Sequence, residues 1–485
     1  MQKYIPFLLI IAVLLISFIY GGIEIGKTES GTSIIDSNTF IDDVGNLIEV
    51  EGPYTRIVSL FTEHTENLFF LDAGENVVGV NTGSTFPYNI IDLPRYSLAK
   101  DYDVQRIIAS NPELVLISPD INRKYPSFVT KLETAGLKVV SLRPKSFDEF
   151  DLYIEKLAML TGKQGEYREV LDDFYSKIEK ISTLASKANK KRTIFFESSE
   201  QGYYTACVDS LPFLAIEYAN GENIAKNPLP EKVNSINSPF GLQKILDNAD
   251  NIDVYTTLQG IEDAGAPIIS INQKSEFNNI KAIKENNLYE IKNIFINSYT
   301  FRYATGVKEI ARFLYPELLD DISYLINDSI LDRQTFAEIV VKYLHIPIYV
   351  NSKSSHYEFE RYNHVYGSFN DVNWKDEYFD YIETVVMRSY LKGFEDEYGQ
   401  NYFSKEGVVT RSDIARFVYI LCNISEKDKH FEIKDIDNDK NKDIIQKVID
   451  NNLMKIDNGY FNPNETYTNK EFIEFLESID NDYYD

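Results

Sequence analysis

Side chains that could perform catalysis are scarce in the first two thirds of the sequence. Up to residue 320 the chain holds one histidine, His64, and one cysteine, Cys207, and it has no glycine-rich phosphate-binding loop. The next histidine is His345, which excludes a metal site with several histidine ligands in this part. Cys422 is the only other cysteine, so a disulfide scaffold or a cysteine-based zinc site is excluded too. We therefore predict that the protein is not an enzyme and carries no cofactor.

His64 itself follows a predicted strand directly after Glu63. It could ligate a metal, but a solvated loop histidine is the simpler interpretation. The acidic run at 435–443 alternates like a calcium loop, yet Lys440 and Gln446 stand where such a loop has glycine and glutamate. We predict no metal site.

Aromatic rings and an arginine are better suited to hold a ligand. They follow predicted strands or lie in loops, and open α/β sheets bind ligands at the carboxyl ends of their strands. Rings stack on a flat ligand, and a guanidinium pairs with an anionic group. The candidate ligand-binding residues are Phe61, Thr62, His64, Phe86, Tyr88, Tyr203, Tyr204, Phe301, Arg302 and Tyr303. An ion pair within its own domain is the alternative for Arg302, and Tyr299, Arg95 and Arg143 have weaker claims.

The elements that position these residues form two similar sets. Over 40–146, buried strands at 56–60, 77–80, 114–117 and 138–142 alternate with helices at 66–73, 104–110 and 128–135. Strands that are apolar on both faces indicate a parallel sheet covered on both sides. Over 190–321 we expect strands at 193–196, 252–256 and 267–270 and helices at 211–219, 242–248 and 306–314.

One long amphipathic pattern at 147–189, broken only near Gly162, separates the two sets. It predicts a helix that joins two Rossmann-like α/β lobes with a cleft between them. Clefts between domains are preferred ligand sites.

Charge and hydropathy distinguish the C-terminal tail and the N-terminus from the two lobes. The net charge is −26, which disfavours nucleic acid as a partner. Residues 321–485 alone hold 18 Lys and Arg against 32 Asp and Glu, so this acidic stretch reads as its own domain. Residues 1–25 are mostly apolar and predict an export signal or an uncleaved membrane anchor, with a polar spacer at 26–39. No cysteine follows the apolar run, so it cannot be a lipoprotein signal.

Residues 40–320 resemble the class III solute-binding proteins of ABC importers, which bind ferric siderophores, haem or cobalamin. The order and spacing of the similar segments carry this resemblance, because no single motif is specific. They are Asp43-x-Gly45 before 56–60, Thr65-Glu66 leading to Ala73-Gly74 and 77–80, the stretch 102–117 with Asn111-Pro112-Glu113, 219–224, 282–289 and 306–319 with Tyr315-Pro316-Glu317. The resemblance implies an iron complex, haem or corrinoid as the ligand and a rigid interlobe helix.

One feature departs from the family. Its importing members carry a surface glutamate on each lobe that docks onto arginines of the permease. The matching positions here are Gln105 and Gln243, so permease docking is in doubt or uses nearby acids such as Asp103 and Asp247.

The tail, 322–485, resembles S-layer homology repeats, about two and a half of them and mostly α-helical. The second repeat runs from Asn370-Asp371 to a helix at 414–421, the third from Lys434-Asp435 to Thr468-Asn469, and the first shows only its closing half at 331–344. The resemblance implies binding to a pyruvylated secondary cell wall polymer. Arg333, Thr410 and Arg411 match the family's Thr-Arg motif, whereas Asn469 does not. An arginine fork suits a polymer carboxylate.

Together these expectations describe a solute-binding protein outside the cell that serves an ABC importer. Its tail holds it to the cell wall, and its N-terminus is either an export signal or an anchor in the membrane. The alternative is a surface or S-layer-associated structural protein that keeps the binding fold without transport. The paired glutamines favour this alternative.

Overall fold

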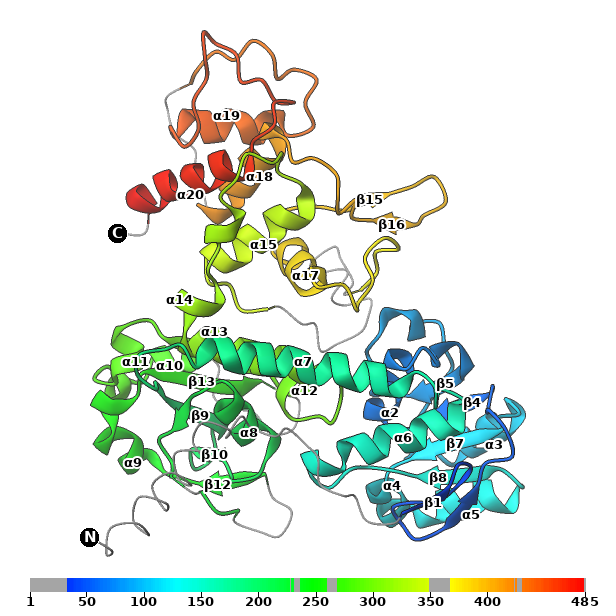
Figure 1. Cartoon of the computed structure of the whole chain (residues 1–485). Coiled ribbons are helices and arrows are strands. Elements are labelled where there is room, and N and C mark those ends of the chain that lie inside the picture. Colours follow the sequence, from blue (N-terminus) through cyan, green and yellow to red (C-terminus); the bar gives the residue numbers. More distant parts are fainter. Residues whose placement is uncertain are drawn as a thin grey trace, which may run out of the picture.

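The computed structural model describes residues 33–226, 228–230, 236–259, 268–348, 367–422, 424 and 430–483. The predicted signal or anchor at 1–25 lies outside these ranges. Within them, no helix has the length and apolar character needed to cross a bilayer. Figure 1 shows two α/β lobes side by side, joined by a helix, with a helical tail above them.

The first lobe has the predicted parallel sheet. Its strand order is β6-β5-β4-β7-β8, from β4 (Ile57–Ser59), β5 (Val77–Asn81), β6 (Arg95–Tyr96), β7 (Leu114–Ile117) and β8 (Lys138–Ser141). Alternate residues of β7 enter two different hydrophobic clusters, Leu114 and Leu116 in one and Val115 and Ile117 in the other. Both faces of the sheet are therefore covered, as the continuous apolar strands predicted.

Helices α2 (Thr62–Phe70), α3 (Asp101–Ala109), α4 (Pro119–Lys124) and α5 (Pro126–Thr134) connect these strands, and β1 (Ile34–Asp36), β2 (Thr39–Ile41) and β3 (Leu47–Glu49) form a small antiparallel sheet before them. The prediction for α2 was wrong at its start, because the helix begins at Thr62 instead of Glu66. Thr65, inside the helix, donates its hydroxyl to Ser59 at 2.8 Å.

The second lobe has a mixed sheet of order β12-β10-β9-β13-β14, with β11 also paired to β9. Its strands are β9 (Thr193–Ser199), β10 (Tyr204–Ala206), β11 (Glu222–Asn223), β12 (Asn237–Pro239), β13 (Val254–Gln259) and β14 (Leu288–Lys292). Strands β10 and β12 run antiparallel and were not predicted. The strand predicted at 267–270 was wrong, since Ile268–Asn272 forms helix α10, and the partner of β13 is β14.

The remaining helices of this lobe are α8 (Leu211–Tyr218), α9 (Leu242–Asp247), α11 (Lys281–Lys284), α12 (Asn293–Ile296), α13 (Tyr303–Leu314) and α14 (Pro316–Leu319).

Two helices, not one, connect the lobes: α6 (Phe150–Thr161) and α7 (Tyr167–Ala185). Gly162 ends α6 in the left-handed region at φ 74°, and a Cβ there would lie 2.8 Å from the Pro53 ring. A glycine at this position is therefore required by both conformation and space. Figure 1 shows that α7 is the helix that reaches from one lobe to the other.

The tail contains α15 (Arg333–Tyr343), α17 (Phe379–Met387), α18 (Arg411–Leu421), α19 (Lys442–Asp450), α20 (Asn469–Tyr483) and a hairpin of β15 (Phe394–Glu395) and β16 (Asn401–Tyr402). The short segments before α15, α18 and α20 pair with one another through the bridges Ile330–Thr468, Asp332–Val408 and Thr410–Thr466. The segments that precede the three helices are thus paired with one another at a common centre.

Candidate functional site

Four side chains gather where the strands of the first lobe end. Phe61 and Glu63 follow β4, Asp120 follows β7 and Arg143 follows β8. The Arg143 guanidinium donates to Asp120 at 2.8 Å, lies 3.8 Å from Glu63 and sits 5.3 Å from the Phe61 ring centroid. We call these four residues the strand-end cluster. Parallel strands bring their carboxyl ends to one edge of the sheet, which is why residues up to 82 positions apart meet here.

Glu63 is the electrostatically unusual member of the strand-end cluster. Burial raises the pKa of its carboxyl to about 7, against the lowering effect of the Arg143 charge. Its Oε2 atom and the Arg143 Nε atom are both buried without a hydrogen-bond partner in the described structure. The cluster therefore has one acceptor and one donor unused, and a carboxyl that changes charge near neutral pH.

The second lobe faces this cluster through Tyr299. Burial, followed by the charge of Glu63, raises the pKa of the Tyr299 phenol to about 12. The main-chain oxygen of Tyr299 also accepts a hydrogen bond of 2.8 Å from the Asn67 amide of α2. Residues of both lobes thus meet at the strand-end cluster, at the position predicted for a ligand.

Tyr203 and Tyr204 lie at the corresponding strand end of the second lobe, after β9, and both are half-buried. The Lys274 ammonium sits 5.0 Å from the Tyr203 ring centroid and bonds to Glu200 at 3.3 Å. These groups supply an aromatic ring with charges of both signs around it.

His64 is not the solvated loop residue that the sequence suggested. It lies inside α2 with a fully buried side chain. Its Nδ1 atom bonds to the Tyr153 hydroxyl at 2.7 Å and its Nε2 atom to the Ile117 carbonyl at 3.0 Å. Burial lowers the pKa of the imidazole to about 4, so the ring is neutral at neutral pH. Because both nitrogens are occupied, the side chain positions α2 and is unsuited to a metal in this conformation.

Arg302 does not form the ion pair within its own lobe that was the alternative suggested by the sequence. Its guanidinium makes a bidentate pair across the lobes with Glu66 of α2, at 2.9 and 2.6 Å. Both side chains are buried. The pair fixes one lobe against the other.

The other aromatic candidates fall in different surroundings. Phe301 and Tyr303 are buried in the core that both lobes share, and the Tyr303 hydroxyl donates to the Leu211 carbonyl at 2.8 Å. Phe86 lies under the Arg302 guanidinium at 4.0 Å and next to Trp374 of the tail, and the backbone of Gly367 approaches Tyr88. Thr62 opens α2 and is half-buried beside the strand-end cluster. Of the ten candidates, Phe61, Thr62, Tyr203 and Tyr204 remain partly exposed at strand ends.

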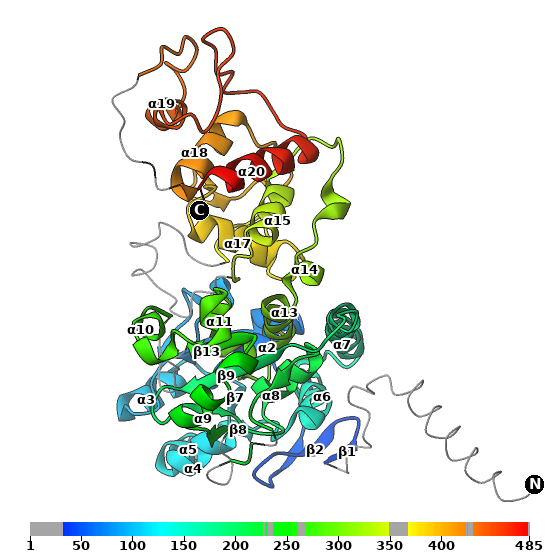
Figure 2. The ribbon, with the colours of Figure 1, turned by 90° about the vertical axis from the view of Figure 1, so that its left-hand side faces the viewer.

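Gln105 and Gln243 are both exposed, on α3 and α9. The Gln243 amide donates to Asp247 at 2.8 Å. Figure 2 shows α3 and α9 on the side of the molecule opposite α7.

The two tail arginines are committed to the main chain. Arg333 donates to the carbonyls of Phe403 and Lys392, and Arg411 donates to those of Phe461 and Lys455 at 2.9 and 3.0 Å. Two donors of each guanidinium are thereby used, so the predicted fork toward a polymer carboxylate is not free in this conformation. Thr410 caps α18 by accepting from the Asp413 N–H.

Comparison with known proteins agrees with this architecture. Residues 57–294 match the family model described as "Periplasmic binding protein". The match covers just under half of the chain and lies within the two lobes. An uncharacterized ABC transporter substrate-binding lipoprotein of Bacillus subtilis is 23% identical over 285 residues, 57% of this chain and 85% of that protein. The vitamin B12-binding protein of Vibrio parahaemolyticus is 22% identical over 270 residues, 55% of this chain and 91% of that protein.

Solved structures of periplasmic binding proteins are also similar to the two lobes. A possible iron-binding protein from Staphylococcus epidermidis has 21% identity and a TM-score of 0.47, over 54% of this chain and all of that one. The periplasmic haem-binding protein of Vibrio cholerae has 17% identity and a TM-score of 0.46, over 54% of this chain and 99% of that one.

Sequence reasoning missed the strand-end cluster as a unit. Glu63 and Asp120 were not singled out, and Arg143 had only a weak claim. The signal was available, since all three follow predicted buried strands and parallel strands end at one edge. Charged residues directly after such strands could therefore have been chosen as candidates by position as well as by type.

Proposed function

We propose that residues 33–320 bind an iron complex, haem or corrinoid and present it to an ABC importer. The observation that carries the proposal is the family match of 57–294 together with relatives named for vitamin B12, haem and iron binding. The strand-end cluster adds suitable chemistry. Phe61 and Tyr203 offer rings for a planar ligand, and Arg143 offers a cation for an anionic group.

Absorbance titration of the purified protein with haem, ferric siderophores and cobalamin tests this function, because all three ligands are coloured. We expect saturable spectral change with one of them. Arg143→Ala should weaken that binding by about tenfold or more, since a charge-assisted hydrogen bond typically contributes about 1.5–3 kcal/mol. Arg123→Ala is the matched control, because Arg123 is exposed and also bonds to Asp120, at 2.8 Å. Absence of any saturable change would contradict the proposal.

The tail is proposed to retain the protein on the cell wall through its secondary polymer. The three-part centre formed by 329–333, 407–411 and 465–469 supports this part of the proposal, as does the resemblance to S-layer homology repeats. Export is part of the same proposal, with residues 1–25 as signal or anchor.

Cell-wall sedimentation tests the tail. The full chain is expected to pellet with purified wall, and Arg411→Ala should reduce the bound fraction more than Asn469→Ala. The Arg411 guanidinium donates hydrogen bonds to two carbonyls of the next repeat and lies 3.4 Å from the Glu465 carboxylate. The Asn469 side chain makes one hydrogen bond, of 3.3 Å, to Asn327. Loss of such charge-assisted bonds costs about 1.5–3 kcal/mol. Equal retention of both variants would show that the two positions do not differ in function.

The second candidate function is that of a surface protein that keeps the binding fold but takes no part in transport. The exposed Gln105 and Gln243 favour it, because neither lobe offers an acidic group at these positions to a basic permease. The same titration separates the two functions, since a scaffold would bind none of the coloured ligands.

A further inference from the structure

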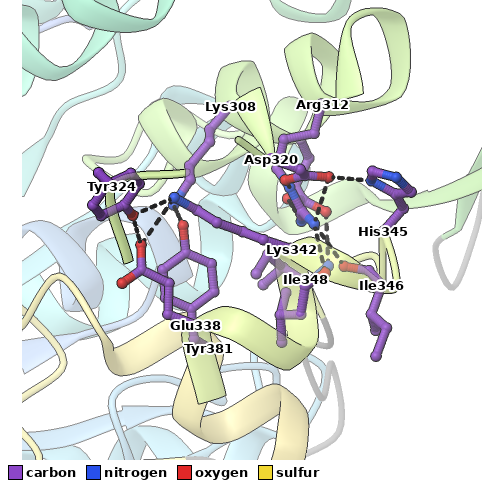
Figure 3. Close-up of polar contacts among 12 residues, drawn as sticks. Lys308, Arg312, Asp320, Tyr324, Glu338, Lys342, His345, Ile346, Ile348 and Tyr381 are labelled. Carbon is purple, nitrogen blue, oxygen red and sulfur yellow. Dashed lines mark hydrogen bonds and ion pairs between the residues drawn. The ribbon is translucent and has the colours of Figure 1, made fainter. Parts of the chain in front are cut away.

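The tail is fastened to the second lobe by buried charges (Figure 3). Arg312 of α13 pairs with Asp320 and Glu309, at 2.5 and 2.7 Å, and donates to the tail carbonyls of Val341 and Ile346 at 3.2 and 3.1 Å. Glu309 in turn accepts the Ile348 N–H at 2.7 Å. All three charged side chains are almost fully buried. The predicted boundary near residue 321 therefore crosses a shared polar core rather than a free linker.

A second contact on α13 lies beside the first. The Lys308 ammonium bonds to the Tyr381 hydroxyl of α17 at 2.7 Å and lies 4.3 Å from the centroid of its ring. Figure 3 shows Lys308 and Tyr381 next to Lys342, which bonds to Glu338 and Tyr324 at 2.9 and 2.7 Å. The tail and the second lobe are thus joined along about one turn of one helix, from Lys308 to Arg312.

The same tail also contacts the first lobe. The Trp374 ring packs edge-on against Phe70 at the end of α2, with centroids 4.3 Å apart, and lies 5.9 Å from Phe86. The neighbouring Lys375 forms an ion pair of 2.8 Å with Asp72. The tail therefore spans the seam between the lobes.

Trp374 stands at the end of a run of aromatic rings that crosses this seam. Phe70 packs on Phe301 of the second lobe at 5.1 Å, and Phe301 packs on Phe150 of α6 and Phe174 of α7 at 5.4 and 5.5 Å. The tail, both lobes and the two connecting helices meet in one cluster. A rotation of one lobe about the connecting helices must change these contacts.

We infer that the tail is a brace that sets the angle between the two lobes. The two attachments differ in strength. Breaking the Arg312 network would expose or isolate buried charges, whereas the attachment to the first lobe consists of aromatic contacts and an exposed ion pair. When the lobes move, the tail remains attached to the second lobe. The contacts of Trp374 with the first lobe are the ones that break.

The brace has a consequence for binding at either end of the molecule. A ligand that binds between the lobes favours one angle between them. A partner that binds the tail acts on the brace, which sets the same angle. Two sites that bias one two-state element are thermodynamically coupled, and the coupling is reciprocal. The inference about the brace itself holds whatever the lobes bind.

Energy transfer between two fluorophores measures the lobe angle directly. The dyes are placed on noncanonical residues at Glu133 of the first lobe and Asp250 of the second, which are exposed and leave Cys207 and Cys422 untouched. In the full chain we expect one narrow distance population. Trp374→Ala should raise the population of other lobe arrangements about tenfold, which corresponds to about 1.4 kcal/mol for two lost aromatic contacts. Tyr398→Ala is the matched control, since this tail ring is 79% exposed.

Lys375→Glu is a second variant that tests the same contact. It changes a surface residue and does not disturb the hydrophobic core. It replaces the ion pair with a repulsion toward Asp72, so it should shift the distances in the same direction as Trp374→Ala but less. Adding Asp72→Asn should reverse the shift. Distances identical to the unmodified protein in both Trp374→Ala and Lys375→Glu would overturn the brace, as would an equal effect of Tyr398→Ala.

Discussion

Replacing Arg312 by methionine is expected to lower the free energy of unfolding by about 3–5 kcal/mol, the usual cost of breaking a buried ion pair by removing one partner. The substitution keeps much of the side-chain volume but leaves Asp320 and Glu309 without their cation. Burial already raises the pKa of the Glu309 carboxyl, and Arg312 is what opposes this. Two tail carbonyls lose their donor as well. Chemical denaturation followed by circular dichroism measures the change.

Arg192→Met is the matched control for this experiment. Arg192 belongs to the same lobe and pairs with Glu317 at 3.1 Å, but Arg192 is only half-buried and Glu317 is exposed. Exposed ion pairs contribute about 0–1 kcal/mol. Similar losses in both variants would mean that the Arg312 network does not join the tail to the lobe.

The second large effect concerns the pair between the lobes. Glu66→Leu and Arg302→Met are each expected to destabilise the protein by about 3–5 kcal/mol, because each leaves a buried charge alone. The double variant should lose less than either single one, since two apolar side chains leave no orphaned charge. This non-additivity is the signature of a buried pair and is measured by a double-mutant cycle.

Simple addition of the two losses would contradict the interpretation. So would a small loss in Arg302→Met alone, which would indicate that water reaches Glu66. The lobe-angle measurement on the same variants adds a structural readout, because the pair fastens α2 to the second lobe.

The order of elements in the first lobe could be predicted from the sequence because the signal there is local. A strand such as 114–117 is apolar on both faces, and glycine and asparagine residues mark the turns around it. In the second lobe, β10 and β12 have three residues each, too few for any periodicity. Their antiparallel pairing depends on the path of the intervening chain, which no local pattern records.

In the tail, the helix predicted at 414–421 exists, but its predicted start was three residues too late, since α18 begins at Arg411. The role of the arginines that begin α15 and α18 could not be predicted. Arg333 and Arg411 were expected to face a ligand, but carbonyls of the neighbouring repeat approach them in the folded state. An arginine fork suits a carbonyl pair and a carboxylate equally well, so residue type alone does not choose between them.

By itself, the sequence determined the two α/β lobes, the helical connection between them and the helical character of the tail. The tertiary structure alone decided which charges are satisfied and which residues meet. Arg302 pairs with Glu66, which lies 236 positions earlier in the sequence, and Trp374 of the tail packs against Phe70 and Phe86 of the first lobe. Local patterns fix secondary structure because its hydrogen bonds join near neighbours. Pairing between distant segments is fixed only when the whole chain is packed, since the partner of a buried charge or ring is whatever the fold places within reach.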